Sequence, residues 1–184
     1  GTLGRPAQIV ISGAGLVAAE TATLLRDRGH QVTLLEKEPV LTGKLNIACH
    51  GEHKADLRRF RDYLLTQLRK SSVTVHTGVL ADTDVVRGLK PDALVIAVGA
   101  TPSRIPLPGV DGDNCMQISE FLQSPDTSLQ HYIIIGGGSV GCETALDLAE
   151  KGKDVSIIEM ADCLASASND LYRLALSEHF ARYD

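Results

Sequence analysis

The hydrophobic residues of this chain fall into short runs that alternate with helical patterns. The run at residues 9–11 is too short for a helix and too uniformly apolar for a strand with one solvent-facing side. It therefore predicts a buried strand of a parallel sheet. Residues 17–29 follow with good helix formers whose apolar positions recur at helical spacing. A second apolar run, residues 32–36, predicts another buried strand, so the segment indicates a strand–helix–strand unit of the α/β class.

This strand–helix–strand pattern occurs twice in the chain. Residues 9–36 align with residues 132–159 without a gap when the sequence is shifted by 123 positions. Many of the identical positions are residues on which turns, helix packing and charge depend. They include Gly13/Gly136, Gly15/Gly138, Glu20/Glu143, Gly29/Gly152 and Glu36/Glu159. One structural unit is therefore used twice.

Each copy has a glycine-rich turn between its first strand and its helix. The motif is GxGxxA in the first copy and GxGxxG in the second, at Gly13, Gly15 and Ala18 and at Gly136, Gly138 and Gly141. In such a motif the first glycine permits a sharp turn, the second lets a diphosphate approach the backbone, and the small third residue lets the helix pack on the strand. The N–H groups and the dipole at the helix start attract phosphate.

A glutamate ends the second strand of each copy, 23 residues after the first glycine of the motif. The carboxylates of Glu36 and Glu159 can accept hydrogen bonds from both hydroxyls of a ribose, each worth about 1.5–3 kcal/mol for a charged acceptor. A single glycine motif could equally be a bare turn between a strand and a helix. Two copies in matching frames, each with its acid, predict two dinucleotide-binding sites.

The segment between the copies continues the α/β pattern. It predicts a loop over residues 37–54, a helix over residues 55–70, a strand at residues 73–77, then turn residues, and a buried strand at residues 94–98. The proline-rich stretch at residues 102–109 cannot continue a helix or a central strand, so a domain boundary is placed near residue 112.

After that boundary, a short helix is expected around residues 118–122, ahead of the second copy. A longer helix is expected over residues 169–183. The chain ends where the first half has its third strand, so we expect the second unit to be truncated before its own third strand.

Charge and composition narrow the functions further. The net charge of −5 and the lack of long basic runs argue against broad nucleic-acid binding. No window of 18 apolar residues is present that could span a membrane. The four cysteines and six histidines are dispersed, without the spacing of metal ligands or a disulfide framework. We therefore expect a cytoplasmic protein without a metal site.

Several segments in this order resemble one family over nearly the whole chain. They are GAGLVAAETA, VTLLEK, LTGKLNIAC, DALVIAVGATP, IPLPGVDG and IIIGGGSVGCETALDLAEKG. Together they resemble the pyridine-nucleotide–flavin oxidoreductases with two dinucleotide-binding domains. The loop TGKLNIAC narrows the resemblance to the flavin/nicotinamide portion of the 2,4-dienoyl-CoA reductase and 2-enoate reductase group. The fold implied is a Rossmann-like FAD-binding domain, with residues 1–112 as its first part, followed by an incomplete Rossmann-like NAD(P)-binding unit, residues 113–184.

The resemblance implies roles for residues of the first unit. Glu36, with Lys37 beside it, would lie at the ribose in the ADP half of FAD. Two further groups would contact this cofactor: Gly43, Lys44 and Leu45 at the flavin, and Gly99, Ala100 and Thr101 over the phosphates. The chain departs from the family pattern at Ala18, a tolerated replacement of glycine, at Thr42 in place of a glycine, and at Val98 in place of a threonine.

Cys49 could match one member of the cysteine pair that disulfide reductases of the wider family carry. Lys44 occupies the place of the other member, which excludes dithiol chemistry. We therefore interpret Cys49 as a small buried residue.

In the second unit, the resemblance implies NAD(P)H binding through Gly136, Gly138, Ser139, Val140 and Gly141. Glu143 matches an acid that lies near the nicotinamide in relatives, although an acid near a helix N-terminus is also favoured by the helix dipole alone. Glu159 is followed by Met160, Ala161 and Asp162, which offer no arginine for a 2′-phosphate. NADH is therefore expected as the substrate, and NADPH is disfavoured.

The expected function is that of a module that passes hydride from NADH to FAD and electrons onward to an enoate- or enoyl-type reductase centre. The resemblance places FMN and an iron–sulfur cluster in a missing upstream part, so the remaining domains of the full-length enzyme are the expected partners. No catalytic residue can be named, and the isolated fragment is expected to lack turnover. An open sheet edge predicts self-association. The alternative is a structural module that binds ADP without redox chemistry.

Overall fold

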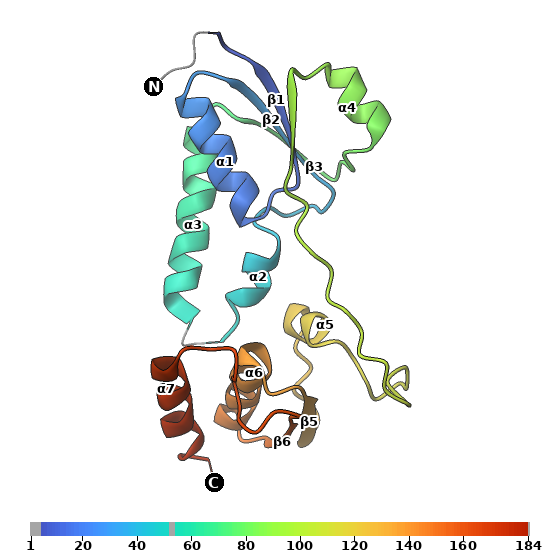
Figure 1. The fold of residues 1–184 in the computed structure, drawn as a ribbon, viewed down its shortest axis with the longest axis vertical. Helices are drawn as coiled ribbons and strands as arrows, with labels where there is room; N and C mark the ends of the chain where they lie inside the picture. Colours follow the sequence, from blue (N-terminus) through green and yellow to red (C-terminus); the bar gives the residue numbers. More distant parts are fainter. Residues whose placement is uncertain (1–4, 52–53, 184) are drawn as a thin grey trace. The chain divides into compact units, whose positions relative to one another are not determined.

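The computed structural model describes residues 5–51 and 54–183 and divides the chain into two compact units, Gly1–Arg104 and Ile105–Asp184 (Figure 1). Residues 101–107 between the units form irregular chain, as their prolines require. The boundary of the functional domains near residue 112 stays a prediction. None of the helices in the described residues is long and apolar enough to cross a membrane.

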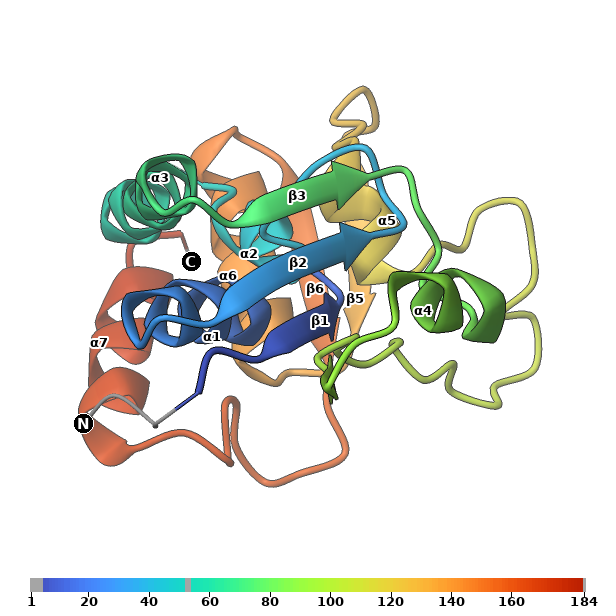
Figure 2. The same ribbon diagram turned by 90° about the horizontal axis from the view of Figure 1, so that it is seen from above.

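The first unit contains a parallel four-stranded sheet in the order β3-β2-β1-β4. Its strands are β1 (Gln8–Ser12), β2 (Gln31–Glu36), β3 (Thr74–Thr77) and β4 (Ala93–Ile96). Figure 2 shows β1, β2 and β3 side by side and pointing the same way. Because the strands are parallel, their carboxyl ends lie at one edge, where open α/β sheets bind ligands.

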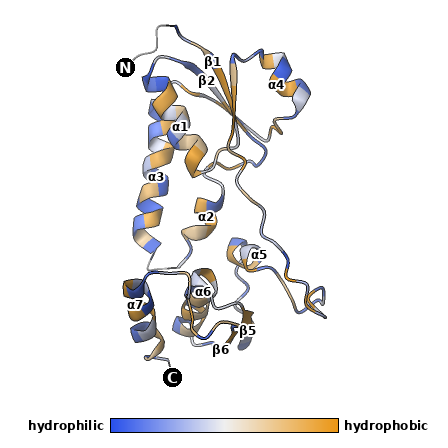
Figure 3. Cartoon of the chain, viewed as in Figure 1, coloured by the Kyte–Doolittle hydropathy of each residue, from blue (hydrophilic) through white to orange (hydrophobic). Residues whose placement is uncertain are grey.

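Helices α1 (Leu16–Asp27) and α3 (Ala55–Lys70) lie together on one side of this sheet (Figure 1). Both helices alternate hydrophobic and hydrophilic residues along their length (Figure 3), as amphipathic helices must when one face is buried. The small residues Ala18, Ala19 and Ala22 of α1 are fully buried, which lets this helix approach the sheet closely. They share a core with Ile9, Ile11, Val32, Leu34 and Leu68.

Two short helices of the first unit do not follow from the hydrophobic pattern. Helix α2 (Lys44–Ala48) lies within the segment expected to be a loop, and α4 (Thr83–Leu89) lies where only turn residues were expected. Helix α4 begins with an N-cap that the sequence contains: one carboxylate oxygen of Asp82 accepts from the N–H groups of Asp84 and Val85.

The second unit contains the parallel strands β5 (His131–Ile135) and β6 (Asp154–Ile158). Its helices are α5 (Ile118–Gln123), α6 (Ser139–Glu150) and α7 (Asp170–Phe180). The small core around α6 and α7 contains Cys142, Leu146, Ala165 and Leu176. The positions of α5 and α7 confirm the two helices expected in this part of the chain.

One face of the β5–β6 pair is bare among the described residues. Ile133 is 69% exposed and Ile158 is 56% exposed, whereas the equivalent residues of the first unit, Val10 and Leu35, are 3% and 2% exposed. The expectation of buried strands is therefore wrong for this face, and also for Ile96 of β4, which is exposed. A parallel strand is buried on both sides only where other chain covers both faces, and a local apolar run cannot show what covers it.

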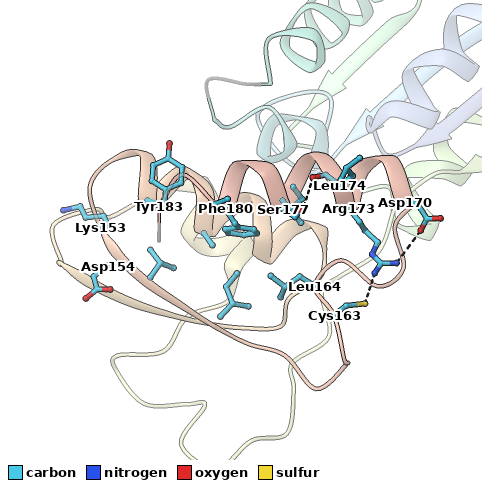
Figure 4. Close-up of a pocket in the computed structure, with 16 residues that line it drawn as sticks. Lys153, Asp154, Cys163, Leu164, Asp170, Arg173, Leu174, Ser177, Phe180 and Tyr183 are labelled. Carbon is cyan, nitrogen blue, oxygen red and sulfur yellow. Dashed lines mark hydrogen bonds and ion pairs between the residues drawn. The ribbon is translucent and has the colours of Figure 1, made fainter.

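A cavity of about 910 Å³ lies between β6, α6 and α7 (Figure 4). Its apolar lining includes Val155 and Ile157 of β6 and Leu176 of α7. In the first unit, the space beside the equivalent β2 residues is filled by Leu68 and Val75, and Val75 belongs to β3. The cavity thus corresponds to the place that β3 and its neighbouring side chains fill in the first unit.

A substitution at Lys90, at the end of α4, tests the backbone geometry of the first unit. Lys90 ends α4 in the left-handed conformation, with a φ of 48°, and its side chain is exposed. Lys90→Gly removes the Cβ that disfavours this conformation and should raise the free energy of unfolding by about 0.5–1 kcal/mol. Urea denaturation measures the change, and Lys90→Ala, which keeps the Cβ, is the control. A Lys90→Gly protein no more stable than Lys90→Ala would contradict the prediction.

Candidate functional site: two glycine turns and their acids

The first glycine turn begins directly after β1 and is held from both sides. The N–H of Gly13 donates to the carbonyl oxygen of Leu35 at 2.8 Å, which ties the turn to the end of β2. Gly13 has a φ of 98°, and a Cβ added there would collide with the carbonyl oxygen of Ala97 beyond β4. Only glycine meets both conditions.

Gly15 is the N-cap of α1 and leaves open space where a ligand could approach. Its backbone is extended, with φ −70° and ψ −174°, and a Cβ added there would meet no atom within 4 Å. Gly138 is the N-cap of α6 with nearly the same geometry and the same open space. In each copy the helix starts at the next residue, so its first N–H groups lack intrahelical partners and face this space.

The glutamate at the end of β2 reaches back into the glycine turn. One carboxylate oxygen of Glu36 accepts from the N–H of Ala14 at 2.7 Å, and the other accepts from the N–H of Glu38 at 2.9 Å. Glu36 is 7% exposed, so these charge-assisted bonds offset much of the cost of burying its charge. Lys37 points to solvent beside it, 3.6 Å from a carboxylate oxygen of Glu38.

The second copy repeats these contacts. The N–H of Gly136 donates to the carbonyl oxygen of Ile158 at 2.8 Å, and the N–H of Gly137 donates to Glu159 at 2.6 Å. The other oxygen of Glu159 accepts from the N–H of Ala161 at 2.7 Å. Backbone hydrogen bonds from Ala161 and Gly137 hold the pKa of Glu159 below its usual value, so this carboxylate is charged at neutral pH.

The third position of each motif is also explained by packing. Ala18 is fully buried against the first sheet. At Gly141 in the second copy, a Cβ would collide with the carbonyl oxygen of Gly136. Glycine is therefore required at Gly141, whereas the first turn accommodates the methyl group of Ala18.

The structural repeat extends beyond the residues that show it in the sequence. The N–H of Thr42 donates to the carbonyl oxygen of Ala14, and the N–H of Ala165 donates to that of Gly137, both at 2.7 Å. Thr42 and Ala165 are again 123 positions apart, are both buried, and have φ values of 72° and 49°. The left-handed backbone at Thr42 explains why a glycine suits this position. No shared residue type marks these positions, so sequence comparison alone missed them.

The other predicted residues of the first unit lie in two places. Gly43 lies against the glycine turn, because a Cβ on it would be 3.4 Å from the Cα of Gly15, and Lys44 and Leu45 start α2 directly after it. Cys49 is a buried free thiol. Gly99, Ala100 and Thr101 form exposed irregular chain beyond β4. Their roles at a cofactor stay predictions.

The predicted residues of the second unit are at the start of α6 and in its second turn. Val140 is exposed. The hydroxyl of Ser139 lies 2.9 Å from that of Ser168, and a carboxylate oxygen of Glu143 accepts from the hydroxyl of Tyr172 at 2.9 Å. Ser168 and Tyr172 were not singled out in the sequence, because nothing local connects them to α6.

The donor set of both turns fits a dinucleotide. Each turn offers open space at its second glycine, a helix N-terminus, and a carboxylate fixed at the end of the second strand. A carboxylate has about four acceptor positions, so two backbone bonds leave room for ribose hydroxyls. A metal centre has no comparable support: no group of three or more His, Cys, Asp or Glu side chains in the described parts of the chain could hold an ion.

Comparison with known proteins agrees with this geometry. Two family models described as pyridine nucleotide-disulphide oxidoreductase match residues 51–182 and 8–85. The chain is 34% identical to an NADH oxidase from Thermoanaerobacter brockii, over 95% of this chain and 28% of that protein. It is 30% identical to a cinnamate reductase from Clostridium sporogenes, over 89% of this chain and 24% of that protein.

A solved structure is similar over almost the whole chain. The complex of 2-naphthoyl-CoA reductase with 2-naphthoyl-CoA superimposes with a TM-score of 0.91 at 26% identity, over 98% of this chain and 27% of that one. The chain thus spans only about a quarter of the length of these proteins. With a family model matching most of the sequence and both glycine turns in place, the chain belongs to the pyridine nucleotide-disulphide oxidoreductase family, as an FAD- and nicotinamide-nucleotide-binding module.

Proposed function

We propose that this module is the electron-input part of an NADH-dependent flavin reductase. FAD is assigned to the first turn and NADH to the second, and the electrons pass to an enoate- or enoyl-type centre elsewhere in the full-length protein. The observation that supports this most strongly is the duplicated turn, with its acid hydrogen-bonded to the backbone in the same way in both copies. The similarity to a cinnamate reductase and a 2-naphthoyl-CoA reductase supports the class of acceptor.

The cofactors supply the hydride chemistry when bound, and the protein contributes binding and orientation. The start of α1, with Gly15, would hold the diphosphate of FAD, Glu36 would hold its adenosine ribose, and Gly43 would lie at its flavin end. The start of α6, with Gly138 and Ser139, would hold the diphosphate of NADH, and Glu159 would hold its adenosine ribose. Glu143 is assigned to the nicotinamide end.

The partners proposed are the remaining domains of the full-length protein, where the resemblance also places FMN and an iron–sulfur cluster. The cytoplasm is the proposed location, because the four cysteines are free thiols and NADH is a cytoplasmic reductant.

The proposal is tested first with the full-length protein. It should purify with the visible absorption of bound flavin, and NADH should bleach this band under anaerobic conditions. A colourless protein that ADP stabilises against heat, and that does not take up added FAD, would instead favour the nucleotide-binding structural module.

Substitution of the second glycine of each turn by alanine should weaken cofactor binding without destabilising the fold. Gly15→Ala and Gly138→Ala place a methyl group in open space, so the free energy of unfolding should change by no more than about 1 kcal/mol. The same methyl group would meet the incoming diphosphate. We expect Gly15→Ala to weaken FAD binding and Gly138→Ala to weaken NADH binding, each by about tenfold or more.

Calorimetric titration and urea denaturation measure the two effects. Gly141→Ala is the matched control in the second unit, because its methyl group would collide with the protein backbone and should destabilise the fold itself. If Gly15→Ala and Gly138→Ala bind both cofactors as the natural protein does, the diphosphates do not lie at these turns.

Nucleotide selectivity should depend on the charge of Glu159. Its carboxylate is ionised at neutral pH and would repel the 2′-phosphate of NADPH. Glu159→Gln removes this charge, so the preference for NADH over NADPH should fall by about tenfold. The ratio of the two dissociation constants is the measurement. Glu36→Gln makes the same change in the other unit and should leave that ratio unaltered; a ratio that Glu159→Gln leaves unchanged would rule out the repulsion.

A further inference from the structure

Two polar pairs join the start of α7 to the start of α6. The hydroxyls of Ser139 and Ser168 lie 2.9 Å apart, and the hydroxyl of Tyr172 donates to Glu143 at 2.9 Å. Ser139 and Glu143 are four residues apart on α6, so they lie on the same face of that helix. Ser168 and Tyr172 have the same spacing. The predicted nicotinamide-binding face of α6 is therefore in contact with α7 and the residue before its cap.

Tyr172 is well fixed and remains a hydrogen-bond donor. Its ring packs against the core of the second unit, and its N–H donates at 2.9 Å to the Asn169 side chain that caps α7. Burial raises the pKa of the Tyr172 hydroxyl, and the hydrogen bond to Glu143 raises it further. The hydroxyl therefore keeps its proton at physiological pH and can donate a hydrogen bond to the carboxylate of Glu143.

The Tyr172–Glu143 pair belongs to the second unit alone. In the first copy, the residue equivalent to Glu143 is Glu20, which is exposed, and the residue 123 positions before Tyr172 is Cys49, which has no hydroxyl. The first unit builds the same glycine turn without such a pair. The repeated fold therefore does not require it, and a role specific to the second nucleotide is the better explanation.

We propose that Tyr172 is a positioning residue for hydride transfer from NADH: its hydroxyl holds the Glu143 carboxylate in the orientation that receives the nicotinamide end of the nucleotide. This inference rests on the proposed function, which assigns NADH to the second turn. A carboxylate on a helix surface otherwise samples several rotamers, and selecting one of them on binding costs free energy. The hydrogen bond from Tyr172 selects this rotamer before NADH binds, so the cost does not arise on binding. A misplaced nicotinamide would slow hydride transfer even when the rest of NADH is bound.

The test uses the full-length protein with bound FAD and the substitution Tyr172→Phe, which keeps the ring and removes the hydroxyl. Anaerobic stopped-flow reduction by NADH gives the rate constant for flavin reduction separately from the dissociation constant of NADH. We expect the rate constant to fall by about tenfold. The dissociation constant, set mainly by the adenosine and diphosphate contacts, should change by less than about threefold.

A double-mutant cycle shows whether Tyr172 acts through Glu143. If it does, Glu143→Gln should also slow reduction, and the double variant should be no slower than Glu143→Gln alone. Tyr132→Phe is the matched control, since its hydroxyl donates to the backbone carbonyl of Asp126 at 3.0 Å and not to a residue of α6, and it should leave the rate unchanged. Urea denaturation of each variant measures any loss of stability.

Three outcomes would overturn the inference. They are an unchanged rate in Tyr172→Phe, an unchanged rate in Glu143→Gln, or losses that multiply in the double variant, as a structural role of Tyr172 would produce. Failure of the natural protein to reduce its flavin with NADH would have a different meaning, because it would contradict the proposed function itself.

Discussion

The structure of each unit depends on one interaction, the hydrogen bonding between a strand-end glutamate and the glycine turn. Glu36 accepts from Ala14, and Glu159 accepts from Gly137, in each case across 22 positions of sequence. A charged acceptor makes such a bond roughly twice as strong as a neutral one. It directs one N–H of the turn inward to the carboxylate and leaves the N–H groups of the following helix start facing the open space at the second glycine. The same contact thus fixes the turn and places the acid beside the proposed diphosphate position.

The two copies keep this geometry and differ in what surrounds it. The loop after each acid returns to the turn through a buried residue in left-handed conformation, Thr42 or Ala165. Gly13 is backed by the carbonyl of Ala97 beyond β4, whereas a Cβ at Gly136 would meet no atom within 4 Å. Only the second copy adds the contact between Tyr172 and Glu143. The shared parts suit features that two dinucleotides have in common, and the differing parts suit the ends at which FAD and a nicotinamide nucleotide differ.

Much of this was predictable because the signals are local. Both units, their parallel pairing and the residues of both turns were predicted from one local pattern. This pattern is a strand, glycines at fixed spacing, a helix, and an acid at the end of the next strand. The helix over α3 followed from its apolar spacing, and the capping residue Asp82 could have predicted α4. Exposure of the isoleucines on β5 and β6 could not be predicted, since an apolar run is the same whether its second face is covered or bare.

The sequence alone determined the duplicated strand–helix–strand unit, the glycines and acids of both turns, and the family, since backbone conformation and close packing restrict those positions to very few residue types. Tertiary structure decided which atoms the acids bind, that Thr42 and Ala165 are equivalent, and that Tyr172 meets Glu143. These contacts join residues far apart in the chain through backbone groups or long side chains. Many residue types can supply such groups, so no local pattern records them.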